Sequence, residues 1–107
     1  MTTFDKREEA FEAKFARDES LRFKAVVRRN KALGLWAAEK LGLEGTEAEA
    51  YARSVVESDF EEAGDDDVYR KVKADLDAKA VDVSEHRLRR TMDELMAAAI
   101  ESLKASS

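Results

Sequence analysis

Few residues in this sequence have the type and spacing that catalysis or metal binding requires. His86 is the single histidine, and it stands beside Ser84 and Glu85 in the first turn of a predicted helix. That position is typical of an exposed residue at a helix start, and a zinc site would need further His or Cys ligands. The sequence has no cysteine and no glycine-rich phosphate-binding loop. These observations indicate that the protein is not an enzyme and requires no metal or cofactor.

A cluster of carboxylates in the middle of the chain could attract a divalent cation. It lacks the Asp-x-Asp-x-Asp-Gly spacing of a calcium loop, and several of its members lie where a helix is expected to begin. Carboxylates at such a position cap free backbone N–H groups and interact favourably with the helix dipole. Capping is therefore the better interpretation. The cluster comprises Glu61, Glu62, Asp65, Asp66 and Asp67.

A basic segment around the only tryptophan is the strongest candidate for ligand binding. Residues 21–40 carry six bases against one acid, whereas residues 41–82 carry five bases against thirteen acids. Cations beside an indole could hold ADP or ATP through phosphate pairing and base stacking. Nucleic acid is a poorer partner, because the net charge of the chain is -5. The remaining interpretation is an exposed basic face that the acidic helices balance. The candidate residues are Arg28, Arg29, Lys31 and Trp36.

The composition predicts that helices position these side chains. The chain has 107 residues, of which 40% are charged, with no proline and only four glycines. A β-rich fold would need turn residues at short intervals, so we expect an all-α domain with long solvated helix faces. No apolar run approaches a membrane span, and the N-terminal residues lack the apolar region of a secretory signal. We therefore expect a cytoplasmic protein.

Helix signals divide the chain into four predicted helices that form an antiparallel bundle. The first reaches Lys40 before a glycine-containing turn, and later helices are predicted at residues 47–62, 66–79 and 84–103. Thr46 with Glu49 matches a capping box, and Ser84 is the expected cap of the last helix. The core face of the first helix is predicted at Phe23, Val26, Val27, Asn30, Leu33, Ala37 and Leu41.

The N-terminal segment, residues 1–20, does not fit this bundle and is predicted to be an arm. Phe4, Phe11 and Phe15 fall within roughly 40° of one another on a helix that is otherwise charged or Ala-rich. Residues 16–20, with the sequence ARDES, interrupt this aromatic row, so we place the bundle at residues 21–107. The arm is expected to be mobile or a helical overhang. Its phenylalanines either fold back onto the bundle or enter another protein's groove, and we predict that they point outward.

The N-terminal sequence also resembles a known family. FDKREEAFEAKFARDESLRFKAVVRRNKALGLWAA is similar to the opening of the zeta subunit, the inhibitor of alphaproteobacterial F-type ATP synthase. The resemblance extends along the whole chain, including the turn after Leu41 and the C-terminal helix rich in Leu, Met and Ala. It implies a four-helix bundle whose N-terminal segment inserts at a catalytic α/β subunit interface, contacts the rotor γ subunit and blocks rotation during ATP hydrolysis.

The resemblance also implies an inhibitory element and the state of the free protein. The protein is expected to be monomeric when free, and peripheral to the inner membrane when bound to the synthase, without inserting into the bilayer. The family is associated with ADP or ATP binding, which leaves a nucleotide-binding adaptor as the alternative function. The inhibitory element carried over onto this sequence is Phe4, Asp5, Lys6, Arg7, Glu8, Phe11, Glu12, Lys14 and Phe15.

Overall fold

A computed structural model of the chain describes the backbone of residues 3–59 and 65–106, and side chains in these ranges from Glu9 onward. This part of the chain forms helices joined by turns, with no strand, which confirms the all-α class. The helices are α1 (Thr3–Arg17), α2 (Glu19–Lys40), α3 (Gly45–Ser58), α4 (Asp66–Ala78) and α5 (Glu85–Ser106).

The long first helix of the sequence prediction is two helices, separated at Asp18. The Asp18 backbone is extended, and its carboxylate accepts hydrogen bonds from the backbone N–H groups of Ser20 at 2.9 Å and Leu21 at 3.4 Å. Asp18 is therefore the N-cap of α2. The predicted interruption within residues 16–20 is confirmed, whereas one continuous helix reaching Lys40 is wrong. The cause is local, because an aspartate bonded to the backbone competes with helix continuation.

The other helix boundaries follow the sequence signals in part. Ser84 caps α5 by accepting a hydrogen bond from the Arg87 backbone N–H at 3.1 Å, as predicted. The capping box at Thr46 is wrong, because α3 already begins at Gly45 and follows Glu44, whose side chain makes no capping bond. The predicted end of this helix at residue 62 lies outside the described residues.

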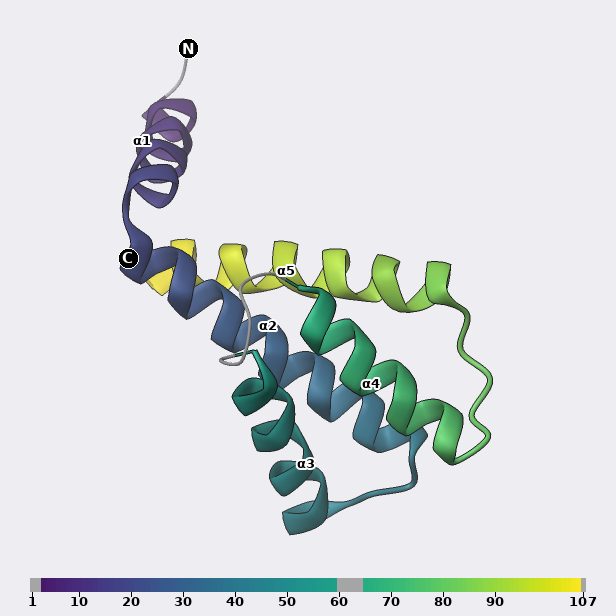
Figure 1. The fold of residues 1–107 in the computed structure, drawn as a ribbon. Coiled ribbons are helices and arrows are strands. Elements are labelled where there is room, and N and C mark those ends of the chain that lie inside the picture. The colour runs from purple at the N-terminus through teal and green to yellow at the C-terminus, as the bar shows by residue number, and fades with distance from the viewer. Residues whose placement is uncertain (1–2, 60–64, 107) are drawn as a thin grey trace.

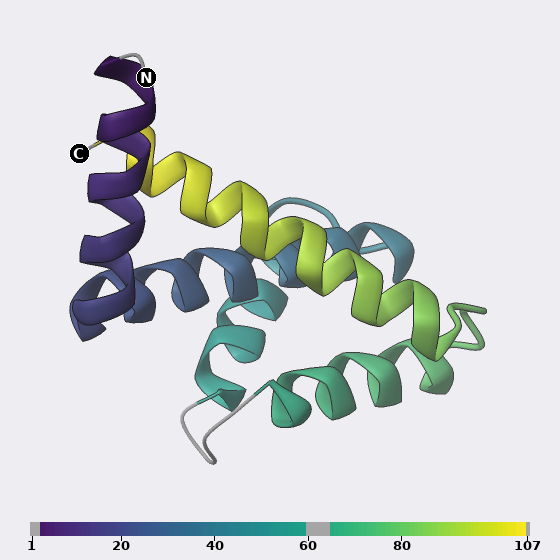
Figure 2. The same ribbon diagram turned by 90° about the horizontal axis from the view of Figure 1, so that it is seen from above.

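Helix α2 is the centre of the fold and contacts every other helix. From α2 to α5 the chain broadly reverses direction at each connection, so that α3, α4 and α5 surround α2 (Figure 1). Helix α1 stands apart at one end, where it crosses the beginning of α2 and the end of α5 (Figures 1 and 2). Helices α3, α4 and α5 thus pack around α2, with α1 at one end, while the predicted division at residues 20 and 21 stays a prediction.

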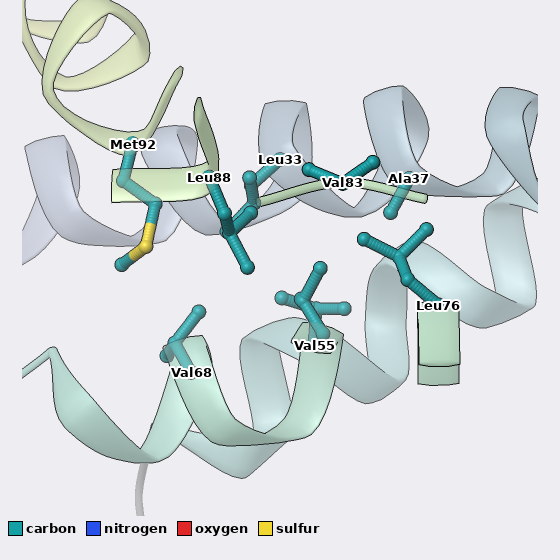
Figure 3. Close-up of a cluster of buried hydrophobic side chains, with 9 residues drawn as sticks. Leu33, Ala37, Val55, Val68, Leu76, Val83, Leu88 and Met92 are labelled. Carbon is teal, nitrogen blue, oxygen red and sulfur yellow. The ribbon is translucent and has the colours of Figure 1, made fainter. Parts of the chain in front are cut away.

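The main core lies between α2 and the three later helices, and Figure 3 shows its side chains converging. Gly34 allows α2 and α3 to approach closely, because a Cβ atom there would lie 2.5 Å from Ala52 Cα. The cluster consists of Leu33, Ala37, Val55, Val68, Val72, Leu76, Val83, Leu88 and Met92. None of these residues precedes Leu33, so the arm makes no contribution to this core.

The buried face of α2 differs from the predicted one. Asn30, Leu33 and Ala37 are buried as expected, but Phe23 is 54% exposed. Helix α2 packs through small side chains, and Ala25 is its only buried residue before Arg29. The predicted face requires that other helices pack along the whole length of α2. In the structure, Ala25 is buried near the start of α2, whereas Phe23 faces solvent. The buried residues of α2 are Ala25, Arg29, Asn30, Leu33, Gly34, Ala37 and Ala38.

Candidate functional site

Two phenylalanines of α1, Phe11 and Phe15, dock on the protein's own surface. Phe11 is 8% exposed and packs in a small cluster with Ala25 of α2 and Leu103 of α5. Phe15 is half-buried at its edge, and the two rings stack with their centroids 6.2 Å apart. The expectation that these phenylalanines point outward is therefore wrong for Phe11, because the ends of α2 and α5 provide an apolar patch that covers it.

Two of the other predicted residues of the arm have described side chains, and both are charged. Glu12 and Lys14 are exposed on α1. The backbone of residues 4–8 is helical, and the side chains of Phe4, Asp5, Lys6, Arg7 and Glu8 lie outside the described residues. The described part of α1 thus has one apolar face against the bundle and a charged face toward solvent. This is the pattern of an amphipathic helix that another groove could also bind.

The connection between α1 and α2 is a single non-helical residue, Asp18. The Asp18 backbone N–H donates to the Lys14 carbonyl at 2.9 Å. The Arg22 guanidinium donates to the Ala16 carbonyl at 2.6 Å, on the opposite side of Asp18. A change in the backbone angles of Asp18 would reorient α1 as a unit without disturbing the main core. Hinges in other proteins are often residues at such element boundaries.

The structure does not bring the four predicted nucleotide-binding residues together. Arg29 is 1% exposed, so it is not part of a basic outer face. Arg28 projects toward α5, where it donates to Ser102 Oγ at 2.5 Å. Lys31 borders α3, whereas Trp36 is half-buried near α5. Consecutive residues on a helix point about 100° apart, so Arg28 and Arg29 face different surroundings.

Arg29 instead organises a polar network inside the fold. Its guanidinium donates to Asn30 Oδ1 and to Asp65 Oδ1, both at 2.7 Å, and Asn30 Nδ2 donates to Asp59 Oδ2 at 3.0 Å. Through these bonds, Arg29 and Asn30 of α2 connect to the end of α3 and the start of α4. Burial raises the pKa of Asp59 above its usual 3.8, while the hydrogen bond from Asn30 and the charge of Arg29 oppose this effect.

Arg29 has the helical spacing of a buried residue, although its charge is typical of an exposed one. Arg29 follows Ala25 by four residues and precedes Leu33 by four, and both neighbours are buried on that face of α2. A helix brings residues with this spacing onto one side. Buried arginines are rare and need a partner, and here the partner, Asp65, is supplied by a distant part of the chain.

Trp36 has a different set of cationic neighbours. Lys40 Nζ lies 4.9 Å from the centre of the Trp36 ring. A hollow of about 320 Å³ beside the indole is lined by Arg87 and Arg90, and a second of about 310 Å³ shares Arg87 and includes Lys40. Arg90 is paired with Glu94 at 3.1 Å. Among the described residues, Lys40 and Arg87 have no ion-pair partner, and the second hollow brings these two cations together with one carboxylate, Asp82.

The described residues do not assemble a metal site. Among residues 3–59 and 65–106 there is no group of three or more His, Cys, Asp or Glu side chains that could hold a metal ion. The carboxylates of the acidic cluster that are described each pair with an arginine, Asp65 with Arg29, Asp66 with Arg89, and Asp67 with Arg70. His86 is exposed at the start of α5.

The same part of the chain contains no helix with the length and apolarity that crossing a bilayer requires.

Comparison with known proteins identifies a matching family and similar solved structures. The model of the family described as "ATPase inhibitor subunit zeta" matches residues 1–102. A protein solved by solution NMR shares 50% sequence identity, with a TM-score of 0.71, and the match covers 81% of this chain and 99% of that one. A comparison with curated proteins finds no match. The family match includes the whole arm, Asp18 and nearly all of α5.

Proposed function

This chain belongs to the family of the ATPase inhibitor subunit zeta, and on that premise we propose that α1 is the inhibitory element. In the proposal, α1 leaves the bundle, enters a catalytic α/β interface of the F-type ATP synthase head and contacts the rotor γ subunit. It thereby stops rotation in the direction of ATP hydrolysis. The observation that carries the proposal is an amphipathic helix joined to an independent core by a one-residue hinge.

Before α1 can bind the synthase head, it must undock from its own bundle, and undocking costs free energy. Undocking exposes Phe11, which costs about 1.5–3 kcal/mol if its burial is lost completely. A groove in the partner would restore that burial and cover Phe15 more fully. The proposed contacts with the head are Phe4, Asp5, Lys6, Arg7, Glu8, Phe11, Glu12, Lys14 and Phe15.

Helicity lowers the remaining cost of insertion. Ordering a flexible segment costs about 1–2 kcal/mol per residue in backbone entropy, and α1 is already helical when docked. Its Ala, Glu, Lys and Arg content also favours helix formation. The free energy of binding to the head then comes mainly from burial of the aromatic side chains and from polar contacts of the charged residues that flank them.

Deletion of residues 1–17 tests this function. The deletion removes α1 but none of the main core, so a folded helical protein without inhibitory activity is expected. Steady-state ATP hydrolysis by the purified head is measured with the full-length and shortened proteins, and circular dichroism checks that the shortened protein folds. Undiminished inhibition by the folded, shortened protein would place the inhibitory element in the bundle and contradict the proposal.

We propose adenine-nucleotide binding as a second function, at a site different from the one that the sequence suggested. The hollows between α2 and α5 place Trp36 beside two cations without ion-pair partners, Lys40 and Arg87. An indole and two cations match the base and phosphates of ADP or ATP. Titration with ADP should change Trp36 fluorescence, and Arg87→Gln should weaken binding, with Arg53→Gln on α3 as the control. No response at millimolar nucleotide would exclude this function.

A further inference from the structure

One face of α2 carries a row of cations that begins shortly after the hinge. Lys24, Arg28 and Lys31 are exposed, and their spacing of four and three residues places them within an arc of about 60°. Leu35, which is 37% exposed, lies in the same row. At a rise of 1.5 Å per residue, the row extends over about 16 Å, and Lys24 lies about 9 Å along the helix from Asp18.

No ion pair joins this row to the acidic helices in the described part of the chain. Among the described residues, Lys24, Arg28 and Lys31 form no ion pair, and the hydrogen bond of Arg28 goes to an uncharged hydroxyl. Of the cations in residues 21–40, Arg29 alone bridges to the acidic segment in the described structure. Direct ion pairs with the acidic helices therefore do not involve these three residues in the described structure.

A shallow groove between α2 and α3 borders the row and gives it an apolar component. The groove has a volume of about 210 Å³, and Ala52 and Val56 contribute the apolar part of its lining. Lys31 and Arg53 stand at its sides, together with one carboxylate, Glu49. The combined surface can accept an apolar side chain between cations, which fits an amphipathic helix with acidic flanks.

We propose that the α2 row, defined as Lys24, Arg28, Lys31 and Leu35 with the adjoining groove, docks on an acidic helix at the surface of the synthase head. This inference rests on the proposed function, because insertion of α1 would bring the row close to the partner. A protein surface is favoured over nucleic acid, since the row is short, includes Leu35 and belongs to a chain with a net charge of -5. Docking of the row would hold α1 near its binding site at a high effective concentration.

The experiment compares two triple variants that lose the same charge. One is Lys24→Gln, Arg28→Gln and Lys31→Gln, and the control is Lys71→Gln, Lys73→Gln and Lys79→Gln around α4. Association and dissociation with the purified head are measured at several salt concentrations, alongside inhibition at saturating protein and the unfolding midpoint of each variant. Exposed charges at an interface mainly change the association rate and its salt dependence.

The row variant should associate about tenfold more slowly at low salt, with a weaker salt dependence, and should still inhibit fully at saturation because α1 is intact. The control should behave like the wild type. Equal association rates for the two folded variants would overturn the docking surface while leaving the proposed function in place. Binding that depends on the row, without inhibition by the wild type, would support docking and refute the inhibitory function. Binding of duplex RNA by the wild type that the row variant loses would overturn the assignment to a protein partner.

Discussion

Replacement of Leu103 by alanine should release α1 without changing the arm itself. Leu103 is 5% exposed and forms the α5 side of the cluster that holds Phe11. The substitution removes three carbon atoms, at about 0.8 kcal/mol for each buried CH₂. Part of Leu103 remains beside Ala25 when the arm leaves, so the loss in docking free energy is at most about 2 kcal/mol. That value shifts the ratio of undocked to docked arm by up to roughly thirtyfold.

Amide hydrogen exchange measures this shift directly. An isolated helix of 15 residues is marginally stable in water, so undocking of α1 should expose its amides to exchange. Exchange in α1 should accelerate by up to roughly thirtyfold in Leu103→Ala, beyond any change in the rest of the protein. The matched control is Leu95→Ala, which removes a leucine of α5 that packs against the main core.

The comparison between the two variants decides the outcome. Leu95→Ala should lower the free energy of global unfolding without a selective effect on α1. If α1 exchanges equally fast in the wild type and in Leu103→Ala, the Phe11 cluster does not hold the arm. A selective increase would also predict faster onset of inhibition of the synthase head by Leu103→Ala, since less of the arm would be sequestered.

Three further substitutions test the scaffold. Gly34→Ala should lower the free energy of unfolding by about 1–3 kcal/mol, measured by urea denaturation, because its Cβ would meet the α3 backbone at Ala52 Cα; rescue by the additional change Ala52→Gly would contradict a backbone clash. Asp18→Ala should cost about 0.5–2 kcal/mol through loss of the N-cap, and an unchanged thermal midpoint would show that this cap is dispensable. Asp59→Asn should raise the free energy of unfolding more at pH 7 than at pH 4, because the raised pKa means that ionisation of Asp59 opposes folding as pH rises. The amide oxygen of the introduced asparagine can still accept the hydrogen bond from Asn30. An equal effect at both pH values would contradict this reasoning.

The sequence was sufficient for features that depend on local chemistry. The absence of proline and the spacing of apolar residues predicted helices, and Ser84 and the break near Asp18 depend on side chains bonding to nearby backbone. The buried residues Val72 and Leu76 of α4, and Leu88 and Met92 of α5, also follow from helical periodicity.

Features that depend on long-range packing could not be read from the sequence. Helical spacing places Arg29 on the buried face of α2, but its partner Asp65 lies 36 positions away, and neither residue alone indicates the pairing. Phe11 was open to two interpretations, because an aromatic face fits the protein's own surface as well as a partner's groove. Phe11 packs on the protein's own surface because Leu103, near the opposite end of the chain, lies in the same cluster. Trp36 likewise acquires Arg87 as a neighbour through the packing of α5 on α2.

The most direct test of α1 insertion is to identify what Phe15 contacts in the free and bound states. A photoreactive benzoylphenylalanine at position 15 should crosslink within the chain to Met96 or Ile100 when the protein is free, because these residues share its cluster. In the presence of the synthase head under ATP hydrolysis, the crosslink should move to the subunits that form a catalytic interface. A crosslink that remains within the chain while hydrolysis is inhibited would contradict insertion of α1.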